Sequence, residues 1–127
     1  MAAQRLTHLY VLNLTLLATH EIDSAYWHEW EMFRLPGGIH FFLVLNLLLL
    51  PILTYGLVQV VHWSRYAKAF SYTLAAAGLF AFAVHAAFLA FDFPQFRSPV
   101  SIGLLAAILA VSVAQIAAVH CEPRRPK

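Results

Sequence analysis

Four long apolar segments, separated by short polar or proline-containing turns, make up most of this chain. They cover about residues 6–26, 38–61, 69–91 and 99–119, and each has the roughly 20 residues that a helix needs to cross a bilayer. Of the 127 residues, 61% are hydrophobic and 11% are charged, whereas an average soluble domain is about 25% charged. We therefore predict an all-α fold: an antiparallel bundle of four transmembrane helices that forms a single integral membrane domain over residues 1–127.

The connections between these segments are too short to hold a second domain. They have no room for a nucleotide-binding loop or a nucleic-acid-binding module, so we expect the lipid bilayer as a partner and no nucleic acid. The first segment lacks the strongly basic start and the Ala-x-Ala site of a cleaved signal peptide, so we expect it to remain as a span. Cys121 is the only cysteine, which excludes an internal disulfide and a cysteine-based zinc motif.

The placement of the basic residues predicts the orientation in the membrane. With both termini on one side, only Arg34 and Arg97 fall on the opposite side. The positive-inside rule then puts both termini in the cytoplasm, and we expect a multi-pass protein of the cell inner membrane. The basic residues on the predicted cytoplasmic side are Arg5, Arg65, Lys68, Arg124, Arg125 and Lys127.

A polar stretch from His20 to Glu31 lies at the end of the first segment and holds most of the acidic residues. Ionisable side chains cost roughly 2.5–3.5 kcal/mol each at the centre of a membrane helix, so they are expected to face the bundle interior and to serve a purpose. Helical spacing of about 100° per residue places the polar residues of each segment on one face. The predicted inward-facing residues are Asn13, His20, Asp23, Ser24 and Glu31, then Asn46, then Gly78, Ala81, His85 and Asp92, and finally Ser101, Ser112 and Gln115.

Histidines of the first and third segments provide the most specific indication of chemistry. His20 and His85 lie at similar depths in their segments, so we expect their imidazoles to face each other, with His40 one shallow turn above. Imidazole and carboxylate groups together are typical ligands of zinc or iron. The sequence therefore predicts a site for a divalent metal, and Glu29 and Asp92 are candidates for a proton or solute path. The candidate metal ligands are His20, Glu21, Asp23, His40 and His85.

Other functions fit the same residues. The polar groups can form a hydrogen-bond cluster that only fixes helix packing, and a haem between His20 and His85 is a further alternative. The leading hypothesis is an accessory membrane protein that binds a metal or protons. The alternatives are a small transporter or channel subunit that works as a homo-oligomer or within a larger complex, and a metal-dependent membrane enzyme. The enzyme is disfavoured because the spacing defines no arrangement of nucleophile, base and electrophile.

The run from His20 to Ala25, followed by Glu29-Trp30, resembles the motif of a family of small bacterial four-helix membrane proteins of unknown function. In that family the motif reads roughly His-Glu-Leu-Asp-Ala, then Glu-Trp, and a later histidine and a Phe-x-Ser-x-x-Ser-like turn precede the last helix. Here His85 matches the later histidine, Phe96 to Ser101 match the turn, and Ser24 replaces the alanine with another small residue. The resemblance implies a four-helix membrane fold but no activity, and it singles out His20, Glu21, Asp23, Glu29, Trp30 and His85.

Overall fold

The chain folds into helices, as the sequence predicts. A computed structural model describes residues 2–122, and no strand occurs within that range. The four long helices follow the predicted segments closely, whereas a single helical turn, α2, interrupts the first connection. The helices are α1 (Ala2–Tyr26), α2 (Glu29–Met32), α3 (Gly38–Val61), α4 (Ala67–Ala90) and α5 (Pro99–Cys121).

Three of these helices are long and apolar enough to cross a membrane. They are α3, α4 and α5, and each contains a stretch of 18 residues that is apolar enough to span a bilayer. The structure thus supports a multi-pass membrane protein with three candidate spans. Helix α1 is 25 residues long but carries polar groups throughout, among them Asn13, His20 and Asp23, so its role as a fourth span stays a prediction.

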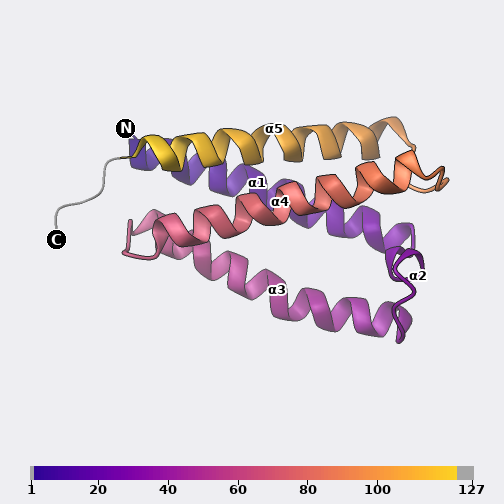
Figure 1. The fold of residues 1–127 in the computed structure, drawn as a ribbon. Helices are drawn as coiled ribbons and strands as arrows, with labels where there is room; N and C mark the ends of the chain where they lie inside the picture. The colour runs from indigo at the N-terminus through magenta and orange to yellow at the C-terminus, as the bar shows by residue number, and fades with distance from the viewer. Residues whose placement is uncertain (1, 123–127) are drawn as a thin grey trace.

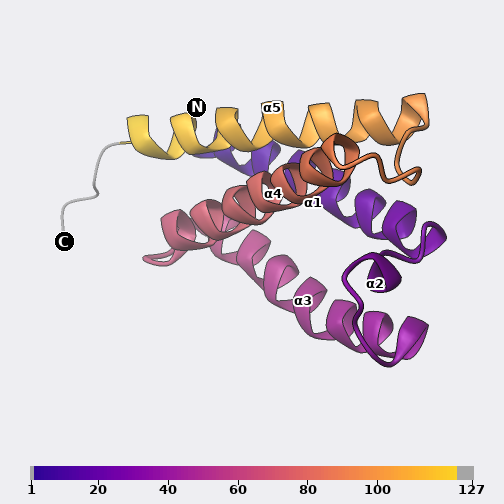
Figure 2. The ribbon, with the colours of Figure 1, turned by 45° about the vertical axis from the view of Figure 1, so that its right-hand side comes forward.

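The long helices pack as an antiparallel bundle in which α3 stands apart from α5. Helix α4 lies along α5, and α1 packs against α3, α4 and α5. Figures 1 and 2 show that α3 leaves α4 near the loop that joins them and diverges from it toward α2. We call the end where α2 lies the α2 end. The start of α1 and the end of α5 lie together at the opposite end (Figure 1).

Apolar residues of all four long helices form the core away from the α2 end. Leu6 and Tyr10 of α1 are fully buried there, and the Tyr10 hydroxyl donates to the Leu53 carbonyl oxygen of α3 at 2.8 Å. Small residues let the helices come this close: a Cβ on Gly56 would lie 2.1 Å from the Tyr10 hydroxyl oxygen, and one on Gly78 would lie 2.1 Å from Ser112 Oγ. Close approach through small residues is typical of helix packing in membranes.

Most of the predicted inward-facing polar residues are buried. Asn13 of α1 donates to Ser112 Oγ at 3.1 Å and to Gln115 Oε1 at 2.8 Å, which joins α1 to α5. Gln115 in turn donates to the Ser71 carbonyl oxygen of α4 at 3.1 Å. The buried members of the predicted set also include His20, Ser24, Asn46, His85 and Ser101.

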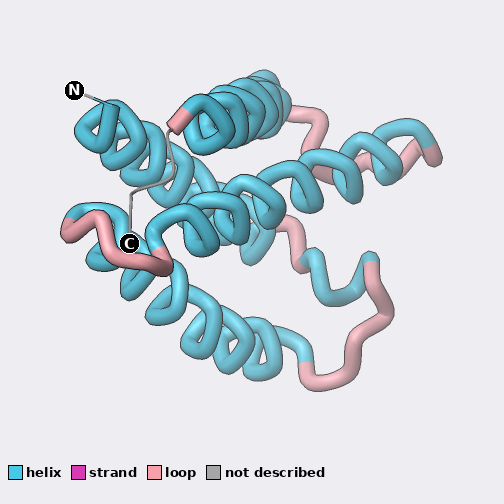
Figure 3. Tube along the Cα trace, turned by 60° about the vertical axis from the view of Figure 1, so that its left-hand side comes forward, coloured by secondary structure: helices cyan, strands magenta, loops and turns pink. Residues whose placement is uncertain are grey.

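The prediction is wrong for Glu31 and Asp92, which are exposed. Both errors have the same cause, because each residue lies beyond the helix whose periodicity was used to place it. Helix α1 ends at Tyr26 and α4 ends at Ala90, and the chain then changes direction. Figure 3 shows these connections as loops at the α2 end, with α2 as a short helical turn within the longer one.

Candidate functional site

The imidazoles of His20 and His85 meet inside the bundle near the α2 end. His20 comes from α1 and His85 from α4, and each residue is only 1% exposed. The two ring centroids lie 4.4 Å apart with an interplanar angle of 84°, so one ring presents its edge to the other. This contact confirms the expectation that the two histidines face each other.

A backbone hydrogen bond fixes the tautomer of His85. Its Nδ1 lies 2.7 Å from the Ala81 carbonyl oxygen, one helical turn earlier. Because a carbonyl oxygen can only accept, Nδ1 donates, and in the neutral ring Nε2 keeps its lone pair. Nε2 is buried without a hydrogen bond and lies 3.5 Å from Glu29 Oε1. When His85 is neutral, two acceptor atoms thus face each other, and either a proton on Nε2 or a metal cation between the two atoms would make the contact favourable.

His20 completes a group of three ligand atoms with Glu29 and His85. One atom from each side chain lies within 4.8 Å of the others, and Nδ1 of His20 is buried without a hydrogen bond. Its Nε2 has only a long contact of 3.5 Å to Ser24 Oγ. Two imidazoles and one carboxylate form a known ligand set of catalytic zinc and of non-haem iron. Zinc bonds of about 2.0–2.1 Å would separate tetrahedral ligands by about 3.3 Å, so binding requires the three side chains to draw closer.

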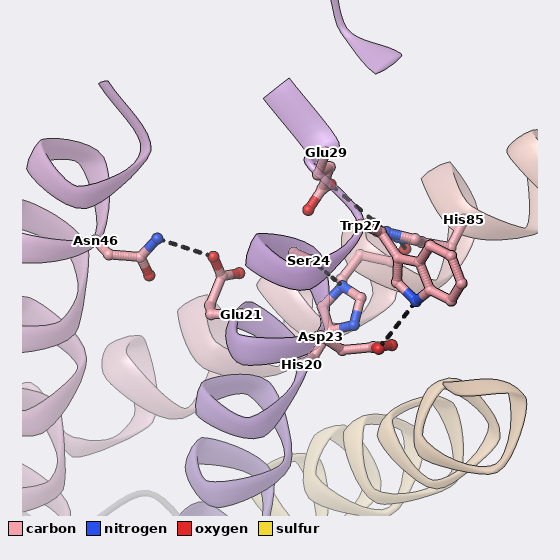
Figure 4. Close-up of polar contacts among 9 residues, drawn as sticks. His20, Glu21, Asp23, Ser24, Trp27, Glu29, Asn46 and His85 are labelled. Atoms are coloured by element: carbon pink, nitrogen blue, oxygen red, sulfur yellow. Dashed lines mark hydrogen bonds and ion pairs between the residues drawn. The ribbon is translucent and has the colours of Figure 1, made fainter. Parts of the chain in front are cut away.

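The remaining predicted metal ligands lie outside this group. Figure 4 shows the Glu21 carboxylate turned away from the histidines toward Asn46 of α3, whose Nδ2 donates to it at 3.0 Å. The Asp23 carboxylate accepts from Trp27 Nε1 at 3.1 Å. His40 is exposed on α3. Of the five predicted ligands, the structure therefore brings together His20 and His85, and Glu29 joins them.

Asp92 lies apart from the histidines on the surface of the α4–α5 connection. Its side chain is 95% exposed and its Oδ1 lies 3.3 Å from a guanidinium nitrogen of Arg97. Arg97 also donates through Nε to the Phe93 carbonyl oxygen at 2.9 Å. These contacts stabilise the α4–α5 connection. Ser98 then caps α5 by accepting a hydrogen bond from the Ser101 backbone N–H at 3.0 Å.

Phe96 covers the histidine pair, a role that sequence reasoning did not assign. This residue of the α4–α5 connection is fully buried, and its ring centroid lies 4.3 Å from that of His85 and 6.0 Å from that of His20. Its φ of 61° is left-handed, which is rare and costly for a bulky residue. The sequence signals were a large apolar residue in a turn between Pro94 and Ser98 and its position at the start of the segment that resembles the family's Phe-x-Ser-x-x-Ser-like turn.

A mostly apolar cavity of about 340 Å³ lies beside the histidine pair, between α1, α3 and α4. Its polar lining consists of His20, Glu21, Glu29 and His85, while apolar side chains such as Leu53 form most of the wall. The cluster of His20, Glu29 and His85 therefore borders a space large enough for a small ligand.

The comparisons with known proteins place the chain in a family without assigning it an activity. No curated protein and no solved structure matches the chain. One family model matches residues 6–122, and its description reads "Family of unknown function (DUF6713)". The match agrees with the earlier resemblance in that both indicate a family of unknown function. Since it extends from the start of the apolar part of α1 to the end of α5, the chain belongs to the family of unknown function DUF6713.

Proposed function

We propose that this protein is an integral membrane protein that binds one divalent cation, such as zinc or iron, through His20, Glu29 and His85. The observation that carries the proposal is the position of His85 Nε2, a buried atom without a hydrogen bond that lies 3.5 Å from Glu29 Oε1. A cation at this point satisfies the imidazole and the carboxylate at once. Compared with the sequence prediction, Glu29 takes the place of Glu21, Asp23 and His40 among the ligands.

The surroundings of the cluster favour a metal site over a packing contact. Metal-bound histidines usually donate their other ring N–H to a carbonyl or carboxylate, as His85 does to Ala81. Burial and the cover of Phe96 keep water from the histidines, which strengthens electrostatic interactions within the cluster. Three protein ligands also leave one coordination position open, as in catalytic zinc sites.

The proposed topology has four spans, with both termini in the cytoplasm and the His20–Glu29–His85 cluster near the outer leaflet of the bacterial inner membrane. Helix α1 serves as the fourth span because its polar residues Asn13, His20 and Ser24 are buried, while Ile22 is 72% exposed. The described basic residues agree with this orientation, since Arg5, Arg65 and Lys68 lie at the end away from α2. The predicted cytoplasmic residues Arg124, Arg125 and Lys127 lie outside the described residues.

A proton in place of the metal is the second candidate, favoured by the same contact between Glu29 and His85. A continuous proton or solute path through a single copy is less well supported. Asp92 is exposed and paired with Arg97, and buried Leu17 lies between His20 and Asn13 on the inner face of α1. These two polar residues are seven positions apart in the helix, a rise of about 10 Å. Transport would therefore need an oligomer or a larger complex.

Zinc titration of the purified protein in detergent, followed by calorimetry and elemental analysis, tests the proposal. We expect about one zinc per chain, and loss of binding in His20→Ala, Glu29→Gln and His85→Ala. His40→Ala is the matched control, because it removes an exposed histidine at the same end of the bundle. A wild-type chain that binds no zinc, or equal losses in His40→Ala and His85→Ala, would contradict the proposal. Proton uptake without zinc binding would select the second candidate.

A further inference from the structure

The cavity beside the cluster is lined by partly exposed side chains both near the α2 end and along α3 and α4. Trp30, which is 8% exposed, lines it from α2, and Phe33 and Leu35, which are 41% and 40% exposed, line it from the segment that follows. On the side, the lining residues Leu45 of α3 and Phe80 of α4 are 45% and 68% exposed. The ribbons of α3 and α4 diverge toward the α2 end (Figures 1 and 2). In a membrane the exposed apolar side chains of α3 and α4 face acyl chains, so a ligand can enter from the bilayer.

The inner wall of the cavity holds polar atoms that lack partners. His20 and His85 both line it, each is 1% exposed, and Nδ1 of His20 and Nε2 of His85 have no hydrogen bond. Glu29 adds a carboxylate beside them. Without a metal these groups offer acceptors to a ligand, and with a metal they offer an open coordination position. A hydroxyl group fits both states, since it can donate a hydrogen bond or bind a metal through its oxygen.

We infer that this cavity binds a single-chain amphiphile from the bilayer, with its apolar chain between α3 and α4 and a hydroxyl head group at the His20–Glu29–His85 cluster. The inference rests on the proposed function, because it names the ligand class of the same site. The cavity walls are no more apolar than lipid tails, so the chain gains little by leaving the bilayer. The head group therefore decides which molecule is retained. A hydrocarbon of equal length, which has no hydroxyl, is not retained.

Competitive photolabelling in phosphatidylcholine nanodiscs tests this inference. The probe is a long-chain primary alcohol that carries a diazirine within the chain. Labelling of peptides containing Leu45 or Phe80 is expected to fall when unlabelled oleyl alcohol is added, because binding at one site is saturable. Octadecene, which has the chain without the hydroxyl, is expected to leave that labelling unchanged. Equal competition by both compounds, or by neither, would overturn the inference.

Two tryptophan substitutions separate the cavity from the lipid-facing surface. Val84→Trp fills the cavity from α4 and is expected to abolish competition by oleyl alcohol. Val113→Trp places the same side chain on α5, where the valine is 53% exposed and lines no part of the cavity, and it is expected to preserve competition. Loss of competition in Val113→Trp, or its retention in Val84→Trp, would contradict the assigned position.

Zinc binding measured on the same preparations distinguishes this inference from the proposed function. Wild-type protein that binds zinc without selective competition overturns the inference alone. Selective competition without zinc binding overturns the metal site and supports a head group held by hydrogen bonds to His85 and Glu29.

Discussion

The rings of Phe96 and His85 lie edge to face with centroids 4.3 Å apart, although Phe96 belongs to a loop and adopts a left-handed backbone conformation. A bulky residue adopts that unfavourable conformation only where its surroundings hold it in place. The contact therefore links the α4–α5 connection to the histidine pair.

Truncation of Phe96 tests this cover. Phe96→Ala is expected to lower the free energy of unfolding by about 3 kcal/mol, because it removes a fully buried ring and opens the histidines to water. Phe91→Ala is the control, since Phe91 is 77% exposed and its loss is expected to cost less than about 0.5 kcal/mol. Unfolding in detergent, followed by circular dichroism, measures both values. Equal costs would show that Phe96 has no special role.

The two glutamates of the polar stretch are expected to have separable roles. Glu29→Gln is expected to abolish zinc binding, whereas Glu21→Gln is expected to preserve it and to destabilise the bundle by about 1 kcal/mol through the weakened contact with Asn46. Calorimetric zinc titration and detergent unfolding of both variants check these outcomes. Loss of zinc binding in Glu21→Gln would contradict this prediction and would indicate that Glu21 is a zinc ligand.

Glycines on two helices predict opposite responses to the same substitution. Gly78→Ala is expected to destabilise the protein by about 1–3 kcal/mol, because the added Cβ would lie 2.1 Å from Ser112 Oγ and 3.2 Å from Ile108 Cγ2. Gly103→Ala on α5 meets nothing within 4 Å and is expected to be neutral or to stabilise by up to about 1 kcal/mol. Midpoints of unfolding compare the two, and a similar change in both would contradict the packing of α4 on α5.

The hydrogen bonds of Asn13 are expected to contribute modestly to stability. Asn13→Leu leaves Ser112 and Gln115 without its amide and is expected to cost about 0.6–1.7 kcal/mol, which spans the average and the maximum for interhelical hydrogen bonds in membranes. Thr15→Val removes an exposed hydroxyl that bonds only within its own helix, and little change is expected. Unfolding measurements would contradict this prediction if Asn13→Leu lost no more free energy of unfolding than Thr15→Val, since the network would then not stabilise the fold.

A bound metal also predicts a stability that depends on metal concentration. At zinc concentrations about 100 times the dissociation constant, binding to the native state adds about 2.7 kcal/mol. Chelation is therefore expected to lower the unfolding midpoint of the wild type and to leave that of His85→Ala unchanged. Equal sensitivity of both proteins to the chelator would point to zinc bound elsewhere.

The long helices could be predicted from the sequence because each has a strong apolar signal bounded by turn residues. Helix α3 has the predicted bounds, and α5 begins at Pro99 behind the cap of Ser98, as its sequence indicates. Helix α2 could not be predicted, since four residues carry no periodicity. The hydropathy of α1 is weakened by the same polar residues that make it the centre of the site.

Only the residues of the candidate site that lie within long helices could be predicted from the sequence. Equal depth in two helices was enough to bring His20 and His85 together. Glu29 and Phe96 follow helix ends, where single left-handed residues redirect the chain: His28 has a φ of 54°, and Phe96 itself has one of 61°. Such turns depend on contacts from several segments, so extrapolating the periodicity of α1 or α4 cannot place the residues beyond them.

Because α3 diverges from α4, the four long helices are not packed equally closely. Within residues 2–122, no Cα atom of α3 lies within 8 Å of one in α5, whereas α1, α4 and α5 all lie against one another. The two histidines thus belong to helices that are in mutual contact, while Glu29 sits on α2, which contacts both α1 and α3. An outward swing of α3, pivoting near its loop to α4, would widen the cavity and draw Glu29 away from the imidazoles. A large ligand in the cavity would then weaken metal binding by Glu29 and the two histidines. The larger the ligand, the lower the affinity of the cluster for its metal would be.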